Sequence, residues 1–333
     1  MLHTKIFRKS ILPALAAGLF LAGCKKEEYA LPVPKDVLQN DVIKRTLGPN
    51  IVGQQIEFAY AMAILPEKGK LVSAQVEASI AGANGTYLEN NAYYTNGSGQ
   101  DVGVPVAEPS VTSGNTTSVT YNVDTFAATL RYYYVIPEEA RGKQVSFTFS
   151  AKSDDGETVS YKMGPYTIAT MDMVRKLNVS NGAAAYISIA DMKVYDEAGA
   201  AANPDKIDLV YVYYADPDVI FNHALVSPAA DAQYLPGVDL PAGVNKSTKV
   251  QKVFNLQDYR LAQSQYGIYI DDLDFEKLDL CNAPDFAINL RAEAGVWAET
   301  SDGKYRAYIY FNSVNNGSKS AVISMKRYTM SGK

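Results

Sequence analysis

The chain has few of the residues on which most metal and nucleophile chemistry depends. Its 333 residues include two histidines, two cysteines and one tryptophan. Protein zinc sites draw mostly on several His and Cys side chains. The sequence also contains no Gly-rich phosphate loop, no HExxH and no GxSxG motif. His223, in "FNHALVSP", is therefore expected to be a hydrogen-bonded structural residue, and we expect a protein that is neither an enzyme nor cofactor-dependent.

A long hydrophobic run is missing from the N-terminal region as well. The apolar stretch from Ile11 to Leu21 has 11 residues, about half of the ~20 that a membrane-spanning helix needs. It follows Lys5, Arg8 and Lys9, and no acidic residue occurs before it. This order is typical of a secretory signal, so residues 1–23 are predicted to be a signal peptide that is removed.

The end of that segment contains one of the two cysteines. Leu21-Ala22-Gly23-Cys24 resembles the bacterial lipobox, which implies that Cys24 becomes the first mature residue and is lipidated. Two or more acyl chains hold a protein on a bilayer almost permanently. The following Lys25-Lys26-Glu27-Glu28 resembles the short acidic export tag of Bacteroidota lipoproteins, which implies the outer face of the outer membrane. Residues 24–50 are interpreted as this lipidated Cys24 and a proline-marked tether.

Basic residues do not outnumber acidic ones. The net charge is −5 and becomes −8 once residues 1–23, with three basic and no acidic residues, are removed. An acidic surface disfavours phosphate backbones and anionic headgroups, so no nucleic-acid partner is expected. With Cys24 lipidated, Cys281 has no partner for a disulfide within the chain. Stability must then come from buried apolar surface.

What the sequence has in abundance is period-two alternation. In "QQIEFAYAMAIL" large apolar side chains alternate with Gln, Glu and three alanines, which is typical of a half-buried strand. "QVSFTFSAKSDDGETVSYKM" predicts a hairpin that turns at Asp155-Gly156. "KIDLVYVYY" and "YGIYIDDLDF" predict further strands, and "GVWAETSDGKYRAYIYF" a second hairpin. We therefore expect an all-β fold of two tandem immunoglobulin-like β-sandwiches, residues 51–172 and 173–333, with at most a short helical turn near residues 37–45.

The densest acidic stretch is "IDDLDFEKLDL". On a strand, Asp272, Asp274 and Glu276 would share one face about 6.5 to 7 Å apart. That spacing is within the ~5 to 9.5 Å of glycosidase carboxylate pairs, so a glycoside hydrolase stays an alternative to the favoured solvated face. A looser calcium site is a further alternative, although Lys277 and Ala283 occupy the glycine and glutamate positions of a helix-loop-helix calcium loop.

Tyrosine is the most unusual component, with 24 tyrosines against 11 phenylalanines. Consecutive strand residues point to opposite faces, so at least one residue of Tyr132–Tyr134 must leave the core. Tyrosine suits half-buried strand positions, which explains most of the 24. A few exposed rings could hold the apolar face of a sugar. The carbohydrate-binding candidates are Tyr93, Tyr94, Trp297 and Tyr310.

Several segments carry a family resemblance: "ATLRYYYVIPEEARGK", "KIDLVYVYY", "HALVSPAA", "YGIYIDDLDF" and "AVISMKRY". Through them the mature chain resembles an uncharacterised family of gut-type Bacteroidota lipoproteins. The "KIDLVYVYY … ALVSP" portion is also similar to lipoproteins encoded beside starch-utilisation-type outer-membrane glycan importers. The resemblance implies an outer-membrane address and supplies no catalytic residues.

Three functional hypotheses follow. The first is a surface lipoprotein that binds polysaccharide without cleaving it, as an accessory to a glycan importer. The second is a structural or adhesin lipoprotein that binds another protein through its sheet edges. The third is the glycoside hydrolase that would use the carboxylates of residues 272–276.

Overall fold

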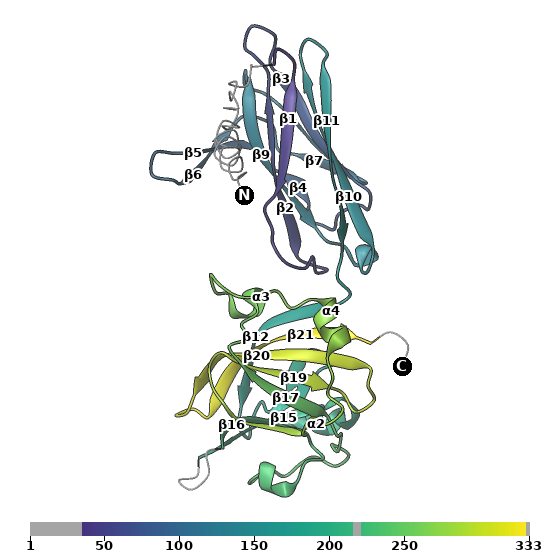
Figure 1. Ribbon diagram of the computed structural model, residues 1–333, viewed down its shortest axis with the longest axis vertical. Helices are drawn as coiled ribbons and strands as arrows, with labels where there is room; N and C mark the ends of the chain where they lie inside the picture. The colour runs from purple at the N-terminus through teal and green to yellow at the C-terminus, as the bar shows by residue number, and fades with distance from the viewer. Residues whose placement is uncertain (1–34, 216–220, 331–333) are drawn as a thin grey trace, which may run out of the picture. The chain divides into compact units, whose positions relative to one another are not determined.

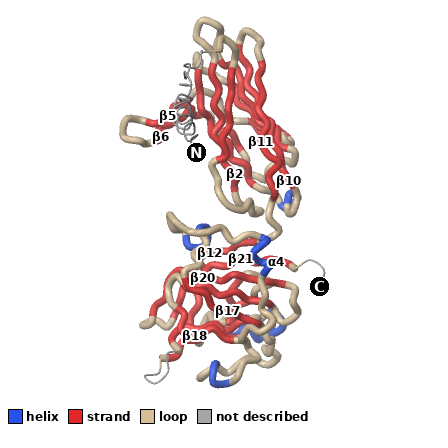
Figure 2. The backbone as a smooth tube through the Cα atoms, in the orientation of Figure 1, coloured by secondary structure: helices blue, strands red, loops and turns tan. Residues whose placement is uncertain are grey.

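Two β-sandwiches account for most of the chain in the computed structural model, which describes residues 35–215 and 221–330 (Figure 1). Every pairing between its named strands is antiparallel. Figure 2 shows that helices are few and short and that strands dominate. The predicted all-β fold of two sandwiches is confirmed.

The first sandwich has a four-stranded and a five-stranded sheet. The former has the order β1-β2-β9-β4, with β1 (Gln39–Lys44), β2 (Gln55–Ala63), β9 (Ala127–Val135) and β4 (Tyr87–Leu88). The latter has the order β11-β10-β3-β8-β7, with β11 (Thr158–Thr167), β10 (Gln144–Ser153), β3 (Leu71–Ala78), β8 (Thr116–Thr120) and β7 (Val111–Ser113). A separate hairpin consists of β5 (Asn91–Thr95) and β6 (Asp101–Pro105), and a 3-10 turn, η1, covers Glu138–Ala140.

Aromatic side chains fill the space between these two sheets. Phe58 of β2 packs against Phe147 and Phe149 of β10, with ring centroids 4.8 and 5.2 Å apart. On β9, Tyr132 and Tyr134 are buried, whereas Tyr133 between them is only half-buried. The alternation in the sequence therefore reports correctly which face of each strand enters the core.

The second sandwich contains two five-stranded sheets. One has the order β12-β21-β20-β19-β17, with β12 (Asp172–Ser180), β21 (Ser320–Thr329), β20 (Tyr305–Asn315), β19 (Ala294–Glu299) and β17 (Lys249–Phe254). The other has the order β14-β13-β15-β16-β18, with β14 (Lys193–Tyr195), β13 (Tyr186–Ser188), β15 (Leu209–Tyr214), β16 (Asn222–Val226) and β18 (Phe286–Leu290). The helical segments are α2 (Glu197–Ala202), α3 (Tyr259–Ala262), α4 (Asp272–Lys277), η2 (Pro204–Lys206) and η3 (Ala232–Tyr234).

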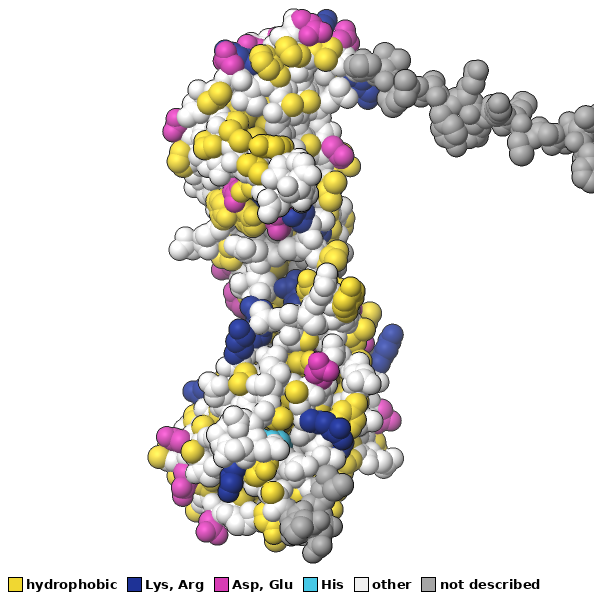
Figure 3. Space-filling view, turned by 90° about the vertical axis from the view of Figure 1, so that its left-hand side faces the viewer, with side chains coloured by type: hydrophobic (Ala, Val, Ile, Leu, Met, Phe, Trp, Pro, Cys, Tyr) yellow, Lys and Arg dark blue, Asp and Glu magenta, His cyan; other side chains and the backbone are white. Residues whose placement is uncertain are grey.

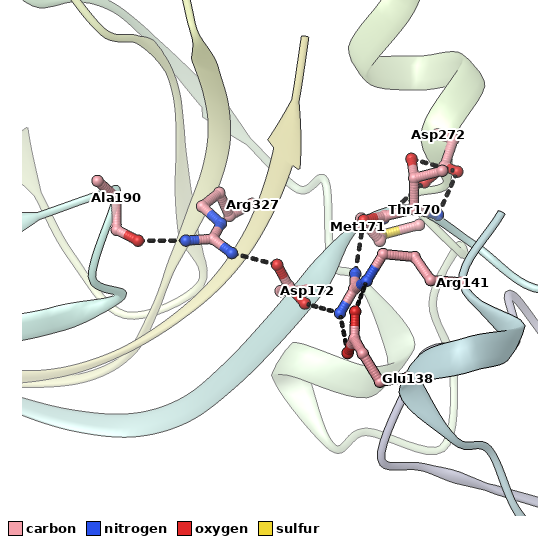
Figure 4. A network of polar contacts seen from close by, with 8 residues as sticks. All are labelled: Glu138, Arg141, Thr170, Met171, Asp172, Ala190, Asp272 and Arg327. Atoms are coloured by element: carbon pink, nitrogen blue, oxygen red, sulfur yellow. Dashed lines mark hydrogen bonds and ion pairs between the residues drawn. The ribbon is translucent and has the colours of Figure 1, made fainter. Parts of the chain in front are cut away.

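A polar network surrounds the segment that joins β11 to β12 (Figure 4). Arg141 donates to the carbonyl of Thr170 and to the carboxylate of Asp172, both at 2.8 Å. Arg327 of β21 donates to the other oxygen of the same carboxylate. Asp272 of α4 accepts hydrogen bonds from the backbone of Thr170 and Met171. The side chains of Arg141, which follows η1, of Arg327 in β21 and of Asp272 in α4 thus hold the joining segment.

The structure corrects the expectation for residues 24–50 and leaves the predicted signal peptide and lipid anchor as predictions. Residues 24–50 are not all tether and do not include a helical turn near residues 37–45, because Gln39–Lys44 form β1 and pair with β2. Burying Leu38 and Val42 gives this strand a reason to join the sheet. The predicted signal peptide, Cys24 and the export tag lie outside the described residues. Within residues 35–215 and 221–330, no helix is long and apolar enough to span a membrane.

Candidate functional site

A groove lies beside the β5–β6 hairpin and the outward face of the four-stranded sheet. Its volume is about 610 Å³. We call it the hairpin groove, and its described lining comes from β1, β2, β5, β6 and β9. Figure 3 shows hydrophobic side chains gathered on the surface of the first sandwich.

Small residues make room for this groove. Tyr60 and Met62 of β2 point into the core, so the residues between and after them, Ala61 and Ala63, face outward. The outward positions of β9 beside them are Ala127 and Thr129. A sheet whose inner face carries large rings and whose outer face carries alanines leaves a shallow apolar floor.

The tyrosine pair of the hairpin stands at this floor. Tyr93 and Tyr94 lie on β5, opposite Gly103 and Val102 of β6. Tyr94 is 56% exposed. A Cβ on Gly103 would stand 3.2 Å from the Tyr93 ring, so glycine there lets the ring pack across the partner strand.

Tyr93 is held in place by charged neighbours. The Arg131 guanidinium lies 4.2 Å from the centroid of its ring, in the range of a cation–π contact. A hydrogen bond to Glu89, together with burial, raises the pKa of Tyr93 to about 12. Arg131 also contacts Glu57 and Asp101. Tyr93 is therefore a fixed wall of the groove, whereas Tyr94 presents its ring to solvent.

The first strand supplies polar groups at the rim. Asn40 donates an amide N–H to the Tyr60 hydroxyl at 3.2 Å, and Asp41 accepts the Val42 N–H at 2.8 Å. Both side chains, with Gln39, line the groove. Asn40 and Asp41 retain further hydrogen-bonding capacity, because an amide has two donors and an acceptor and a carboxylate has two acceptor oxygens. The site thus combines an apolar floor, an exposed ring and a polar edge.

The other two aromatic candidates are not available to a ligand. Trp297 of β19 and Tyr310 of β20 are only 7% and 3% exposed. The chain between β17 and β18 covers this side of the sheet, where Phe275 of α4 packs edge-on against Trp297 at 5.4 Å. The expectation of exposed rings is wrong because the sheet is buried on both faces. The unbroken apolar run "AYIYF" was the signal for this.

The acidic stretch is helical rather than extended, so our strand prediction there is wrong. Asp271 caps α4 in a capping box with Asp274. A helix turns about 100° per residue, so Asp272 and Glu276, four residues apart, lie on one side of α4 and Asp274 lies on the opposite side. Each is held separately: Asp272 by Thr170, Asp274 by the Asp271 N–H, and Glu276 by the Tyr328 hydroxyl.

The predicted spacing of the carboxylates assumed a strand and does not hold for this helix. The two that share a face of α4 are engaged within the protein, Asp272 by the backbone of Thr170 and Met171 and Glu276 by the Tyr328 hydroxyl. In the part of the chain that the structure describes, no group of three or more His, Cys, Asp or Glu side chains is placed to hold a metal ion. The segment that resembled an acidic site in the sequence instead builds and positions α4.

The single histidine of the described chain has a structural environment, as predicted. His223 is buried, with its Nδ1 2.5 Å from the Tyr211 hydroxyl and its Nε2 2.8 Å from Oδ1 of Asn316. Burial lowers the pKa of His223, which favours the neutral ring. Cys281 is an exposed thiol without a disulfide.

Comparison with known proteins places the chain in a family. The crystal structure of a DUF4466 family protein from Parabacteroides merdae is 48% identical, with a TM-score of 0.84, and the match covers 89% of this chain and 100% of that one. The chain belongs to the DUF4466 family. The DUF4466 model matches residues 35–168, and a second domain of unknown function, DUF8576, matches residues 169–330. The resemblance to an uncharacterised Bacteroidota family is thereby supported, without its lipoprotein and importer parts.

More distant structures add nothing specific to this assignment. A cohesin module from a Clostridium perfringens family 33 glycoside hydrolase is 14% identical, with a TM-score of 0.24, covering 40% of this chain and 98% of that one. The major pilin subunit BcpA of Bacillus cereus is 7% identical, with a TM-score of 0.29, covering 88% and 67%. No curated protein matches the chain.

Proposed function

We propose that this DUF4466 protein is a non-catalytic binding protein that holds a polysaccharide in the hairpin groove. The observation that carries the proposal is the exposed Tyr94 ring, which stands beside the floor of Ala61, Ala63 and Ala127. Rings and small apolar side chains suit the C–H faces of a sugar. The amides and the carboxylate of Gln39, Asn40 and Asp41 suit its hydroxyls.

The dimensions of the groove support a chain of sugars. A volume of about 610 Å³ lies in the range of ~300 to 1,000 Å³ typical of ligand sites. Tyr93 is already fixed by Arg131 and Glu89, so little ordering of that wall is needed on binding. Preorganisation of this kind favours affinity because less side-chain entropy is lost.

The proposal of binding without cleavage rests on the surroundings of the groove. General acid–base cleavage of a glycosidic bond uses a pair of carboxylates across the scissile bond. The described lining of the hairpin groove includes one carboxylate, that of Asp41. A lone carboxylate can accept hydrogen bonds from hydroxyls but cannot serve both roles.

A second candidate is the binding of another protein at the same place. β1 is the edge strand of its sheet and also lines the hairpin groove. An edge strand can pair with an extended segment of a partner chain. Stable complexes with other proteins in the absence of sugar would favour this candidate.

Affinity electrophoresis of residues 25–333 through gels that contain different polysaccharides tests the proposal. We expect retardation on at least one gel without release of reducing sugar. Tyr94→Ala should weaken retention, up to about tenfold for the loss of an aromatic contact of roughly 0.5–1.5 kcal/mol. Its melting temperature should not change, because Tyr94 is exposed.

The matched control is Tyr266→Ala. Tyr266 is 78% exposed and is not among the described residues that line the hairpin groove. This variant should migrate like the unmodified protein. Equal loss of retention in both variants, or no retardation on any gel, would sink the proposal.

We further propose that the protein acts at the cell surface. The support is the lipobox-like Leu21–Cys24 and the Lys25–Glu28 segment that follows it, which resembles an export tag. A lipid anchor on Cys24 would place the hairpin groove on the outer membrane, where a glycan importer could take up the bound polysaccharide.

A further inference from the structure

A second cavity contains an unusual concentration of positive charge. Its volume is about 500 Å³, and its described lining includes Arg45, Arg175 and Arg260, with the tyrosines Tyr259 and Tyr269. We call it the arginine pocket. From Val37 onward the chain forms one compact unit, and all five residues belong to it. No Asp or Glu occurs among the described lining residues, although the protein as a whole is acidic.

Arg175 reaches the pocket through an irregularity of its strand. The pairing of β12 with β21 shifts register between Val174 and Leu177, and Lys176 has a positive φ of 60°. A bulge of this kind bends the strand and redirects a side chain. Arg175 is exposed, and neither a hydrogen bond nor an ion pair joins its side chain to the described part of the chain. Its guanidinium donors are therefore available to a ligand.

Arg260 is held so that part of its guanidinium is unused. Its Nη2 donates to the carbonyl of Leu47 at 3.1 Å, whereas its Nε is buried and has no hydrogen-bond partner. Burial lowers the pKa of Arg260, the charge of Asp258 opposes this, and the charge of Arg175 lowers it further. An unsatisfied buried donor on a charged group is costly, and repulsion between neighbouring cations adds to the cost.

The other two cations of this region, Arg45 and Lys44, already have partners within the protein. Arg45 already pairs with Glu57, with Nε 2.8 Å from the carboxylate. Lys44 donates to the carbonyl of Thr46, and burial together with the charge of Arg260 lowers its pKa. These groups add positive potential without filling the pocket. The guanidinium groups of Arg175 and Arg260 therefore keep N–H groups that can donate hydrogen bonds to an anion.

Two tyrosines form an aromatic wall beside these arginines. The rings of Tyr259 and Tyr269 have centroids 5.2 Å apart, with an angle of 41° between their planes. Gly48 makes room for this arrangement, because a Cβ there would stand 2.1 Å from the Tyr269 ring. Tyr259 is 40% exposed. Planar ring and hydroxyl surfaces therefore adjoin the guanidinium groups.

We propose that the arginine pocket binds an oxyanion, the carboxylate, sulfate or phosphate group of a small ligand. Guanidinium groups match these oxyanions with paired, charge-assisted hydrogen bonds. The anion would satisfy the donors of Arg175 and Arg260 and would screen their mutual repulsion. Its carrier is either an acidic sugar, whose ring would lie against Tyr259, or the free inorganic ion. The pocket is separate from the hairpin groove and does not depend on glycan binding there.

Isothermal titration calorimetry of residues 25–333 at constant ionic strength tests this inference. The probes are glucuronic acid, glucose 6-phosphate, inorganic sulfate and, as the neutral control, glucose. At least one oxyanion should bind, and glucose should not. Tighter binding of the sugar acids than of sulfate identifies an acidic sugar as the carrier, and the reverse identifies the free ion.

Matched variants then locate the site. Arg175→Gln should weaken binding about tenfold or more, the usual effect of losing a hydrogen bond to a charged group. Arg291→Gln removes the same charge from an exposed arginine outside the described lining of the pocket and should bind normally. Arg260→Lys keeps the charge but loses the planar fork, so it should also weaken binding.

Two results would overturn the inference: no heat of binding for any oxyanion, or unchanged affinity in Arg175→Gln. Retention of the same variant on polysaccharide gels measures the hairpin groove independently. The two proposals can therefore fail separately.

Discussion

Tyrosine has three different roles in this chain, and the position on a strand decides which. Tyr132 and Tyr134 face inward from β9 and are buried. Tyr133, between them, stacks on Tyr87 at the outer face, with ring centroids 4.9 Å apart. Tyr94 has an exposed ring. The same side chain therefore fills the core, covers a sheet face or stands available to a ligand.

The buried tyrosines make the protein sensitive to alkaline pH. Burial raises the pKa of Tyr60 and of Tyr134 to about 12, against about 10 in an unfolded chain. Their contribution is complete below pH 10 and is lost as pH rises from 10 through 12. Stability should fall in that window, by roughly 2–3 kcal/mol for Tyr60 alone. Burial lowers the pKa of Lys326 below its ordinary value of 10.5, so its contribution to stability rises only up to that pH and does not offset the tyrosine loss above it.

An alkaline titration measures this directly. Tyrosinate absorbance and circular dichroism, recorded on the same samples, should show a late ionisation step that coincides with unfolding. Tyr60→Phe should reduce the loss of stability across the window. Ionisation of all tyrosines near pH 10 with the fold intact would contradict the prediction.

At the scale of elements, α4 shows how capping chemistry can override an apparent strand pattern. The stretch "DDLDF" alternates acidic and apolar residues over a few positions, which we interpreted as a strand. Asp271 instead begins a helix by accepting hydrogen bonds from the N–H groups of Leu273 and Asp274. The spacing D-x-x-D was therefore the more informative signal.

Asp272 links this helix to the segment between β11 and β12. One carboxylate oxygen accepts from the backbone and hydroxyl of Thr170 at 2.7 and 2.9 Å, and the other accepts from Met171 at 3.2 Å. Asp272→Ala should lower the free energy of unfolding by about 1–3 kcal/mol, because it leaves partly buried donors unpaired. Urea denaturation measures the loss.

The control for that experiment is Glu67→Ala. Glu67 is exposed and has no hydrogen bond or ion pair with the described residues. Its replacement should change stability by no more than about 0.5 kcal/mol. Equal midpoints for Asp272→Ala and the unmodified protein would show that the link to the joining segment contributes nothing.

At the scale of the whole molecule, the proposed anchor decides where both binding surfaces work. Cys24→Ser should give an uncut, unlipidated precursor, since no thiol remains to accept the lipid. Detergent phase partitioning and the mass of the purified protein report the change. A mature Cys24→Ser protein that still partitions with membranes would contradict lipidation at Cys24.

Surface exposure is measured separately from lipidation. Protease added to intact cells should cleave the anchored protein if Lys25–Glu28 acts as an export tag. Protection of the unmodified protein until the outer membrane is permeabilised would place it on the inner face instead.

The sequence by itself determined the fold class and the inward faces of the long strands. Period-two alternation in residues 55–63 and 144–153 specifies which side chains enter the first core, because one face of each strand must be buried. It also required that at least one residue of Tyr132–Tyr134 leave the core, and the structure shows that this residue is Tyr133. These are local properties of a pleated chain, and they follow from the order of residues alone.

Only the tertiary structure decided which tyrosines are exposed and where charges meet. Trp297 is buried because the chain between β17 and β18, including Phe275, covers its sheet; the apolar run of β20 indicated a buried sheet but not which residues cover it. Arg175 and Arg260 lie 85 positions apart in the sequence and line one pocket. A ligand site requires side chains from several elements in one place, and that convergence depends on packing rather than on the pattern of any single strand.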